Sequence, residues 1–185
     1  MSTLTGMLTP EMLQNLVNTG EIETVLVVFT DHYGRFMGKR FDADFFLEEG
    51  MVHGTHACDY LLTVDMEMEP VAGYRYSNWE RGYGDFHLVP DLSTLRVATW
   101  LDRTAMVLCD IYTEKTHTLV DVAPRSMLRR QMDRMASSGL VAKAGSELEY
   151  YIYEDSYREA SDLRYTGLRP MGWYLEDYHA PVSYT

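Results

Sequence analysis

Two glutamates, Glu147 and Glu149, lie two positions apart in the tyrosine-rich stretch GSELEYYIY at residues 145–153. We predict a strand from about Val141 to Tyr153, and in a strand residues two apart point to the same face. Their carboxylates would then lie about 7 Å apart along the strand. That spacing suits neighbouring divalent cations such as Mg²⁺ or Mn²⁺, which prefer oxygen ligands. A solvated strand face with two ordinary acids gives the same pattern, so spacing alone leaves both interpretations open.

Two further groups of polar residues could carry chemistry. His53 and His56 have the spacing of a zinc pair, but no third ligand is near them in the sequence, which favours histidines without a metal. The cations Arg35, Lys39 and Arg40 could contact phosphate. Because they fall on a predicted hairpin, we interpret them as surface charges.

The composition indicates a folded, acidic protein. The 185 residues carry a formal net charge of -12, with 46% apolar and 24% charged residues. We expect no nucleic-acid partner, because phosphate binding needs a basic face and this chain is acidic. An anion site on this chain would have to be local or neutralised by divalent cations. No segment approaches the ~20 apolar residues of a membrane span, so we expect no membrane partner.

The two cysteines and one aspartate lie in apolar surroundings. Cys58 and Cys109 have no metal-ligand spacing, and we predict that both are buried thiols of a protein from a reducing compartment, the cytoplasm. Asp110 lies inside an apolar strand and could close a hydrogen-bond network.

The elements that must position these residues form an α+β order. Thr9 and Pro10 predict a helix start, and Gly20 ends its pattern. Asp42 predicts the cap of a short helix that closes at Gly50, and Pro124 opens a later helix that Gly139 stops. We predict strands at 24–29, 35–41, 59–64, 95–100 and 105–112, and a long ordered loop with many aromatic residues at 65–90.

Several segments, in order, resemble the N-terminal region of glutamine synthetases. The match is spread over most of the chain, and its strength is in the ordered set. The segments are DHYGR at 31–35 with GKR at 38–40, FFLEEG at 45–50, GDFHLVPDLST at 84–94, CDI at 109–111, PRS at 124–126 and the Glu-x-Glu pair.

The resemblance implies a fold, an activity and roles for three residues. It implies a β-grasp N-terminal domain at 1–117, followed at 118–185 by the first helix and strand of a catalytic α/β domain. It implies an ATP-dependent ligase that joins glutamate to ammonia or another amine through γ-glutamyl phosphate, in a homo-oligomeric ring with active sites between subunits. By similarity Glu147 and Glu149 match two ligands of Mg²⁺ or Mn²⁺, and Asp85 matches a catalytic acid close to a neighbour's active site.

The sequence departs from the ammonia-using enzymes at residues 53–56. Their amine-site aspartate sits in an Asp-Gly-Ser-Ser pattern, whereas this chain reads His53-Gly54-Thr55-His56. The loop from Ala57 to Gly84 is also longer. In both departures the sequence resembles ligases that accept polyamines, ethanolamine or other amines. The aromatic residues of the long loop either pack in the fold or form a candidate amine pocket. The amine, the ring size and any regulation stay open.

Two expectations concern the extent of the chain. The sequence of residues 173–185 contains no stop pattern and predicts no packed element, and we expect the native chain to continue beyond them. We therefore expect the 185 residues alone to be inactive, because they contain no ATP-phosphate arginine cluster and no complete metal set. The alternative function is a non-catalytic relative that binds other molecules or has a structural role.

Overall fold

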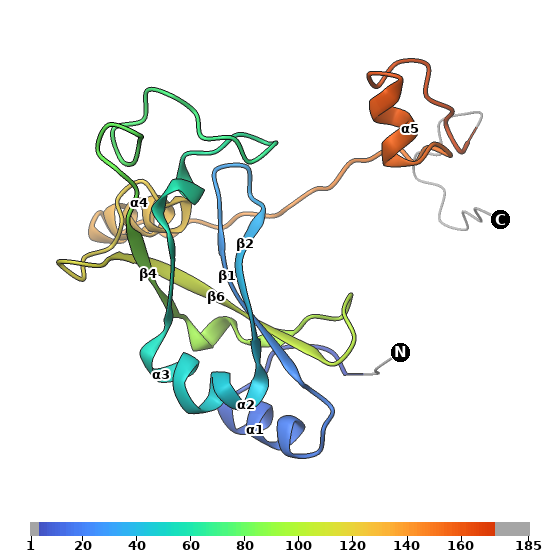
Figure 1. Ribbon diagram of the computed structural model, residues 1–185. Coiled ribbons are helices and arrows are strands. Elements are labelled where there is room, and N and C mark those ends of the chain that lie inside the picture. The colour runs from blue at the N-terminus through green and yellow to red at the C-terminus, as the bar shows by residue number, and fades with distance from the viewer. Residues whose placement is uncertain (1–3, 173–185) are drawn as a thin grey trace. The chain divides into compact units, whose positions relative to one another are not determined.

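The chain divides into two compact units, each of which is described by itself. The computed structural model describes residues 4–172, and the units are Met1–Ala142 and Lys143–Thr185. The first unit is a mixed α/β structure built on one sheet (Figure 1). The domain boundary that we predict at 117/118 differs from this division at 142/143, and it stays a prediction.

A six-stranded sheet organises the first unit. Its strand order is β2-β1-β6-β4-β3, and β5 pairs with β6 beside this path. The pair of β1 with β6 is parallel, and the other pairs are antiparallel. The strands are β1 (Thr24–Thr30), β2 (Phe36–Asp42), β3 (Thr55–Cys58), β4 (Asp85–Pro90), β5 (Arg96–Val97) and β6 (Thr104–Thr113).

Strand β6 connects the two halves of the sheet. Its first half, from Thr104 to Leu108, pairs with β1, and its second half, from Cys109 to Thr113, pairs with β4. Figure 1 shows it as the long yellow-green strand crossing behind the blue β1 and β2 hairpin. One strand therefore holds both halves in a common register.

Short helices cover one end of the core face. Helix α1 (Pro10–Asn18) begins at Thr9, whose side chain accepts a hydrogen bond from the Met12 N–H, and it buries Leu13 completely. A continuous helical stretch follows β2: α2 (Ala43–Phe45), the π-helical turn η1 (Phe46–Gly50) and α3 (Met51–His53). Figure 1 places α1, α2 and α3 together. All contribute side chains to the main core cluster.

The core follows from the alternation of strand side chains. Val25, Val27 and Phe29 of β1 point to one face and are at most 2% exposed. On the same face the Phe29 ring meets the Phe86 ring of β4 edge to face, with 5.2 Å between centroids. The opposite face carries a smaller cluster of Val28, Ala98 and Met106.

Several predicted elements are confirmed. The structure contains the predicted α1, the β1–β2 hairpin, β6 and the helix α4 (Pro124–Ser137). The short helix capped by Asp42 is also present, but it continues past Gly50 to His53.

The prediction was wrong around residues 59–90. The strand predicted at 59–64 is a 3₁₀ helix, η2 (Asp59–Leu62), and the strand β3 comes just before it. The end of the predicted loop is the strand β4. Strand pairing explains both differences, because β3 and β4 form an antiparallel pair in which Thr55 lies opposite Leu88 and Cys58 lies opposite Asp85. The strand predicted at 95–100 shrinks to Arg96–Val97.

The strand predicted from Val141 to Tyr153 is also wrong. Residues 140–152 have no regular secondary structure, and the one ladder contact nearby is an isolated bridge between Tyr153 and Pro170. A strand needs a neighbour for its N–H and C=O groups. In residues 4–172 this stretch has no such partner strand.

The second unit is small. Its helix α5 (Tyr157–Asp162) starts at a capping box in which the Ser156 and Glu159 side chains each bind the other's backbone N–H. Asp155 accepts the backbone N–H of Arg169 and pairs with its guanidinium. The prediction made for residues 173–185 lies outside the described residues.

Candidate functional site

Asp85, the predicted catalytic acid, opens strand β4 on the outward face of the sheet. It lies opposite Cys58 in the register, and its side chain is exposed. Phe86 and Leu88 point to the core, so Asp85 and His87 share the other face. Within residues 4–172 no cationic side chain forms an ion pair with Asp85. Its carboxylate is therefore available to another molecule.

The histidines of the predicted amine region have separate acidic neighbours. His53 lies 3.9 Å from Glu49, whereas His56 lies 2.8 Å from Glu114. The His56 ring instead stacks on His87, its neighbour across the β3–β4 pair, at 4.8 Å between centroids. The described residues contain no group of three or more His, Cys, Asp or Glu side chains arranged to hold a metal ion.

Gly54 has a structural role between these histidines. It ends α3 with φ of +65°, in the left-handed region that favours glycine. A Cβ at this position would lie 2.3 Å from the backbone oxygen of Leu88. The glycine therefore lets the helix end approach β4 closely, and the same approach brings the backbone oxygen of His53 within 2.7 Å of His87 Nε2.

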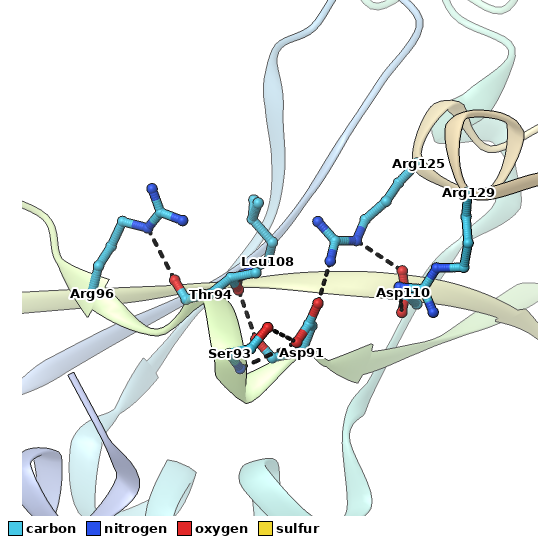
Figure 2. A network of polar contacts seen from close by, with 8 residues as sticks. All are labelled: Asp91, Ser93, Thr94, Arg96, Leu108, Asp110, Arg125 and Arg129. Carbon is cyan, nitrogen blue, oxygen red and sulfur yellow. Dashed lines mark hydrogen bonds and ion pairs between the residues drawn. The ribbon is translucent and has the colours of Figure 1, made fainter. Parts of the chain in front are cut away.

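An ion network fastens α4 to the sheet (Figure 2). Asp110 of β6 is 10% exposed and accepts hydrogen bonds from Arg125 Nε at 2.9 Å and Arg129 Nη2 at 2.8 Å. Arg125 also pairs with Asp91. Hydrogen bonding from the Ser93 hydroxyl, together with the two arginines, holds the pKa of Asp91 below its usual value.

This network confirms the hydrogen-bond role predicted for Asp110, but its partners were missed. The signal was present in the sequence: Arg125 and Arg129 are four residues apart in a predicted helix and so share one helix face. An aspartate buried in an apolar strand needs such partners.

Arg35 is an anchor of the long loop, so its interpretation as a surface charge is wrong. Its guanidinium binds Asp31 at 2.7 Å and donates to the backbone oxygens of Met66 at 2.8 Å and Asp65 at 3.0 Å. Burial acts to raise the pKa of Asp31, but hydrogen bonds from the Arg35 side chain and from the backbone N–H groups of Arg35 and Tyr33 outweigh it and lower the pKa. Lys39 and Arg40 are exposed, as predicted.

The aromatic loop divides into buried and exposed parts. Tyr76 packs against the core, and burial, with the nearby Asp59 charge, raises its pKa to about 12. The Ser77 hydroxyl is buried and donates to Asp59 at 2.6 Å. Trp79, by contrast, is 80% exposed. Tyr76 is therefore a packing residue, whereas Trp79 contributes little to the core.

Both cysteines were predicted to be buried, which is confirmed for Cys109 and wrong for Cys58. Cys109 is buried, and burial with the adjacent Asp110 charge raises its pKa to about 12, so its thiol stays protonated at neutral pH. Cys58 is only half-buried.

Glu147 and Glu149 lie in the second unit, in the stretch without regular structure. Both side chains are exposed, and no cationic side chain of residues 4–172 pairs with them. Because the predicted strand is absent, there is no strand face for the two carboxylates to share. Two carboxylates two positions apart in the sequence could still supply part of a Mg²⁺ or Mn²⁺ shell, which takes six oxygen ligands including waters. The structure brings them into one unit and leaves Asp85 in the other.

Comparisons with known proteins agree with this architecture. The sequence profile of the glutamine synthetase catalytic domain matches residues 121–178. The chain is 46% identical over 168 residues to the gamma-glutamylethanolamide synthetase GlnA4 of Streptomyces coelicolor, covering 91% of this chain and 36% of that protein. It is 30% identical over 159 residues to a glutamate–isopropylamine ligase of a Pseudomonas species, covering 86% of this chain and 34% of that protein.

Solved structures share the fold. A structure described as a novel glutamine synthase homolog aligns with a TM-score of 0.53 and 20% identity, over 63% of this chain and 27% of that one. The GmaS/ADP complex aligns with a TM-score of 0.51 and 21% identity, over 68% of this chain and 26% of that one.

The sequence matches identify the class of protein. The chain belongs to the glutamine synthetase family. It is similar to ligases that join glutamate to an amine, and it spans about a third of the length of the two curated relatives described above. None of the helices in residues 4–172 has both the length and the apolar character that a membrane crossing requires.

Proposed function

We propose that the protein is an ATP-dependent ligase that forms a γ-glutamyl amide from glutamate and an amine. The observation that carries the proposal is the 46% identity, over nearly the whole chain, to a protein named for making gamma-glutamylethanolamide. A second relative is named for isopropylamine. The sequence His53-Gly54-Thr55-His56, which lacks the amine-site aspartate, supports an organic amine over ammonia.

The proposed reaction has two steps. The γ-carboxylate of glutamate attacks the γ-phosphorus of ATP, the bond to the β-phosphate oxygen breaks, and ADP leaves. The amine nitrogen then attacks the γ-carbonyl carbon, inorganic phosphate leaves, and the nitrogen loses one proton. Both steps gather negative oxygens, which divalent cations commonly neutralise.

Three residues of this chain have proposed roles. Glu147 and Glu149 would hold Mg²⁺ or Mn²⁺, and their exposure without ion-pair partners in the described chain fits ligands that a metal could engage. Asp85 would face a neighbouring subunit's active site, and its unpaired carboxylate on the outward sheet face supports this role.

The finer architecture belongs to the same proposal. The hairpin β1–β2 with β6 parallel to β1 supports a β-grasp domain at 1–117, followed by the start of the catalytic domain at 118–185. We further propose a homo-oligomeric ring with active sites between subunits. The free cysteines Cys58 and Cys109 support a reducing, cytoplasmic location.

The test is ADP release by the native polypeptide with glutamate, ATP and Mg²⁺. Ammonium, ethanolamine, isopropylamine and a polyamine are compared as the amine. We expect amine-dependent ADP release that is faster with an organic amine than with ammonium. The 185-residue chain alone should release none. No release by the native polypeptide with any amine would favour the non-catalytic alternative.

Variants separate the metal role from folding. Glu147→Gln and Glu149→Gln in the native polypeptide should reduce ADP release at least about a hundredfold, since metal ligands neutralise transition-state charge. Thermal unfolding should be unchanged, because both side chains are exposed. Glu154→Gln is the matched control, an exposed glutamate of the same unit for which we propose no metal role. Full activity of the Glu147 and Glu149 variants would exclude them as ligands.

A further inference from the structure

Three aromatic rings form a corner at the edge of the long loop. Tyr83 lies at its centre: its ring centroid is 5.1 Å from that of Trp79 and 6.0 Å from that of Tyr60. The interplanar angles are 80° and 74°, so each outer ring stands nearly perpendicular to the central one. We call Tyr60, Trp79 and Tyr83 the aromatic corner. Trp79 is the exposed ring of the three, and Tyr60 and Tyr83 are partly buried.

The corner is held by a hydrogen-bonded turn. The Asn78 side chain accepts the backbone N–H groups of Glu80 and Arg81 and donates to the backbone oxygen of Tyr74 at 2.8 Å. Asn78 and Gly82 also form an antiparallel bridge. Trp79 therefore stands in an ordered turn while its indole is 80% exposed. A rigid aromatic ring costs little conformational entropy when it binds a ligand.

The rest of the loop is fixed to the sheet on two sides. Arg35 ties residues 65 and 66 to the β1–β2 turn. Next to the corner, the Asp59 N–H donates to the Gly84 oxygen at 2.8 Å, and Ser77 binds the Asp59 carboxylate. Trp79 thus lies on an anchored loop, and its exposed side chain does not contribute to the packing of that loop.

The chain segment that carries the corner is acidic, and its carboxylates form no ion pair in the described residues. Residues 59–85 contain six acids and two arginines. In the described chain none of these six carboxylates forms an ion pair, and Arg81 donates to the backbone oxygen of Arg75. Two of the acids, Asp59 and Asp85, lie within two residues of Tyr60 and Tyr83. Trp79 is largely exposed whereas Tyr60 and Tyr83 are partly buried, so a cation would find the Trp79 ring on a loop with uncompensated carboxylates.

We propose that the aromatic corner binds the organic ammonium group of the amine substrate. Cation–π contact with Trp79 and Tyr83 would hold the cation, and the carboxylates of Asp59 and Asp85 would raise its local concentration. Ammonium itself gains less from such a site, because it lacks the alkyl carbons that pack on the rings. This inference names the substrate class of the proposed ligase and rests on that function for its biological meaning.

Binding is tested directly on the 185-residue chain without ATP or glutamate. Isopropylammonium chloride is titrated while the indole N–H of Trp79 and the backbone amides of Glu80 and Arg81 are followed by NMR. Propan-2-ol, which has the same shape without the charge, and sodium chloride are the control titrants. We expect a saturable shift with isopropylammonium alone.

Two substitutions complete the test. Trp79→Leu should weaken isopropylammonium binding about two- to fivefold, the loss expected for one cation–π contact at an exposed ring. Trp100→Leu is the matched control, since Trp100 is 59% exposed in a different turn. No saturable shift, an equal shift with propan-2-ol, or unchanged binding by the Trp79 variant would each overturn the proposal.

The same variants in the native polypeptide separate this inference from the proposed function. Active ligase whose KM for isopropylamine is unchanged by Trp79→Leu would overturn the aromatic corner and leave the ligase intact. Saturable, Trp79-dependent binding by a native polypeptide that never releases ADP would support the cation site and refute the ligase.

Discussion

The two units differ in how much of their structure is buried. In the first unit, both sheet faces carry apolar clusters, and ion pairs fix α4 to β6. In the second, Ala160 is the one buried residue among those described, and the stretch with Glu147 and Glu149 is exposed throughout. The sheet residues already have their partners within the chain, whereas the proposed metal ligands do not. The difference suggests that the glutamates acquire their final geometry only when other protein groups surround them.

Amide hydrogen exchange would give the largest contrast between the units. Amides in the centres of β1 and β6 should be protected about a thousandfold or more, because they open only with global unfolding. Amides of residues 141–152 should exchange within about tenfold of free-peptide rates, since no ladder protects them. Mass spectrometry after pulse labelling of the 185-residue chain measures both. Strong protection of the amides across 141–152 would contradict the difference between the two units.

Core truncation should affect only the first unit. Phe86→Ala should lower the free energy of unfolding by about 3–5 kcal/mol, since Phe86 is 1% exposed and packs on Phe29. Leu148→Ala should change it by less than about 0.5 kcal/mol, because Leu148 is 86% exposed. Urea unfolding followed by circular dichroism measures both. Equal losses would show that residue 148 packs in solution.

The ion network should contribute a smaller amount. Asp110→Ala should cost about 1–3 kcal/mol, because it leaves Arg129 without its partner and Arg125 with Asp91 alone, although Arg129 is 41% exposed and partly screened by solvent. The control is Asp121→Ala, whose 84%-exposed carboxylate pairs with Arg130 and should contribute less than about 1 kcal/mol. If both variants lose the same amount, burial of Asp110 adds nothing.

The smallest effect should depend on pH. The pKa of Asp31 is lowered in the folded protein, so its contribution is present above the unfolded pKa of about 3.9 and is lost as pH falls through the folded pKa. Asp31→Asn should therefore cost about 1 kcal/mol at pH 7 and progressively less below about pH 4. Urea midpoints of both proteins from pH 7 to pH 2.5 test this. A difference that does not change with pH would contradict the assignment.

The sequence predicted the elements whose signals are local. Thr9 and Pro10 marked α1, and the apolar run at 24–29 marked β1. The errors came where distant pairing decides the structure, as at β3 and β4, or where a pairing partner was assumed, as at 141–153. Site residues followed the same rule: types and spacing suggested Glu147 and Glu149, but only the folded structure showed that Arg35 anchors a loop.

The parallel pairing of β1 with β6 also has a consequence for how the chain acquires its fold. Thr24 pairs with Thr104, about 80 positions later, whereas the β1–β2 hairpin joins neighbours. Contacts between distant residues slow folding because the intervening chain must be ordered first. During synthesis, the hairpin can therefore form as soon as it emerges, but its apolar β1 edge must wait for β6. That waiting period is when the nascent chain is most exposed to aggregation and to chaperones.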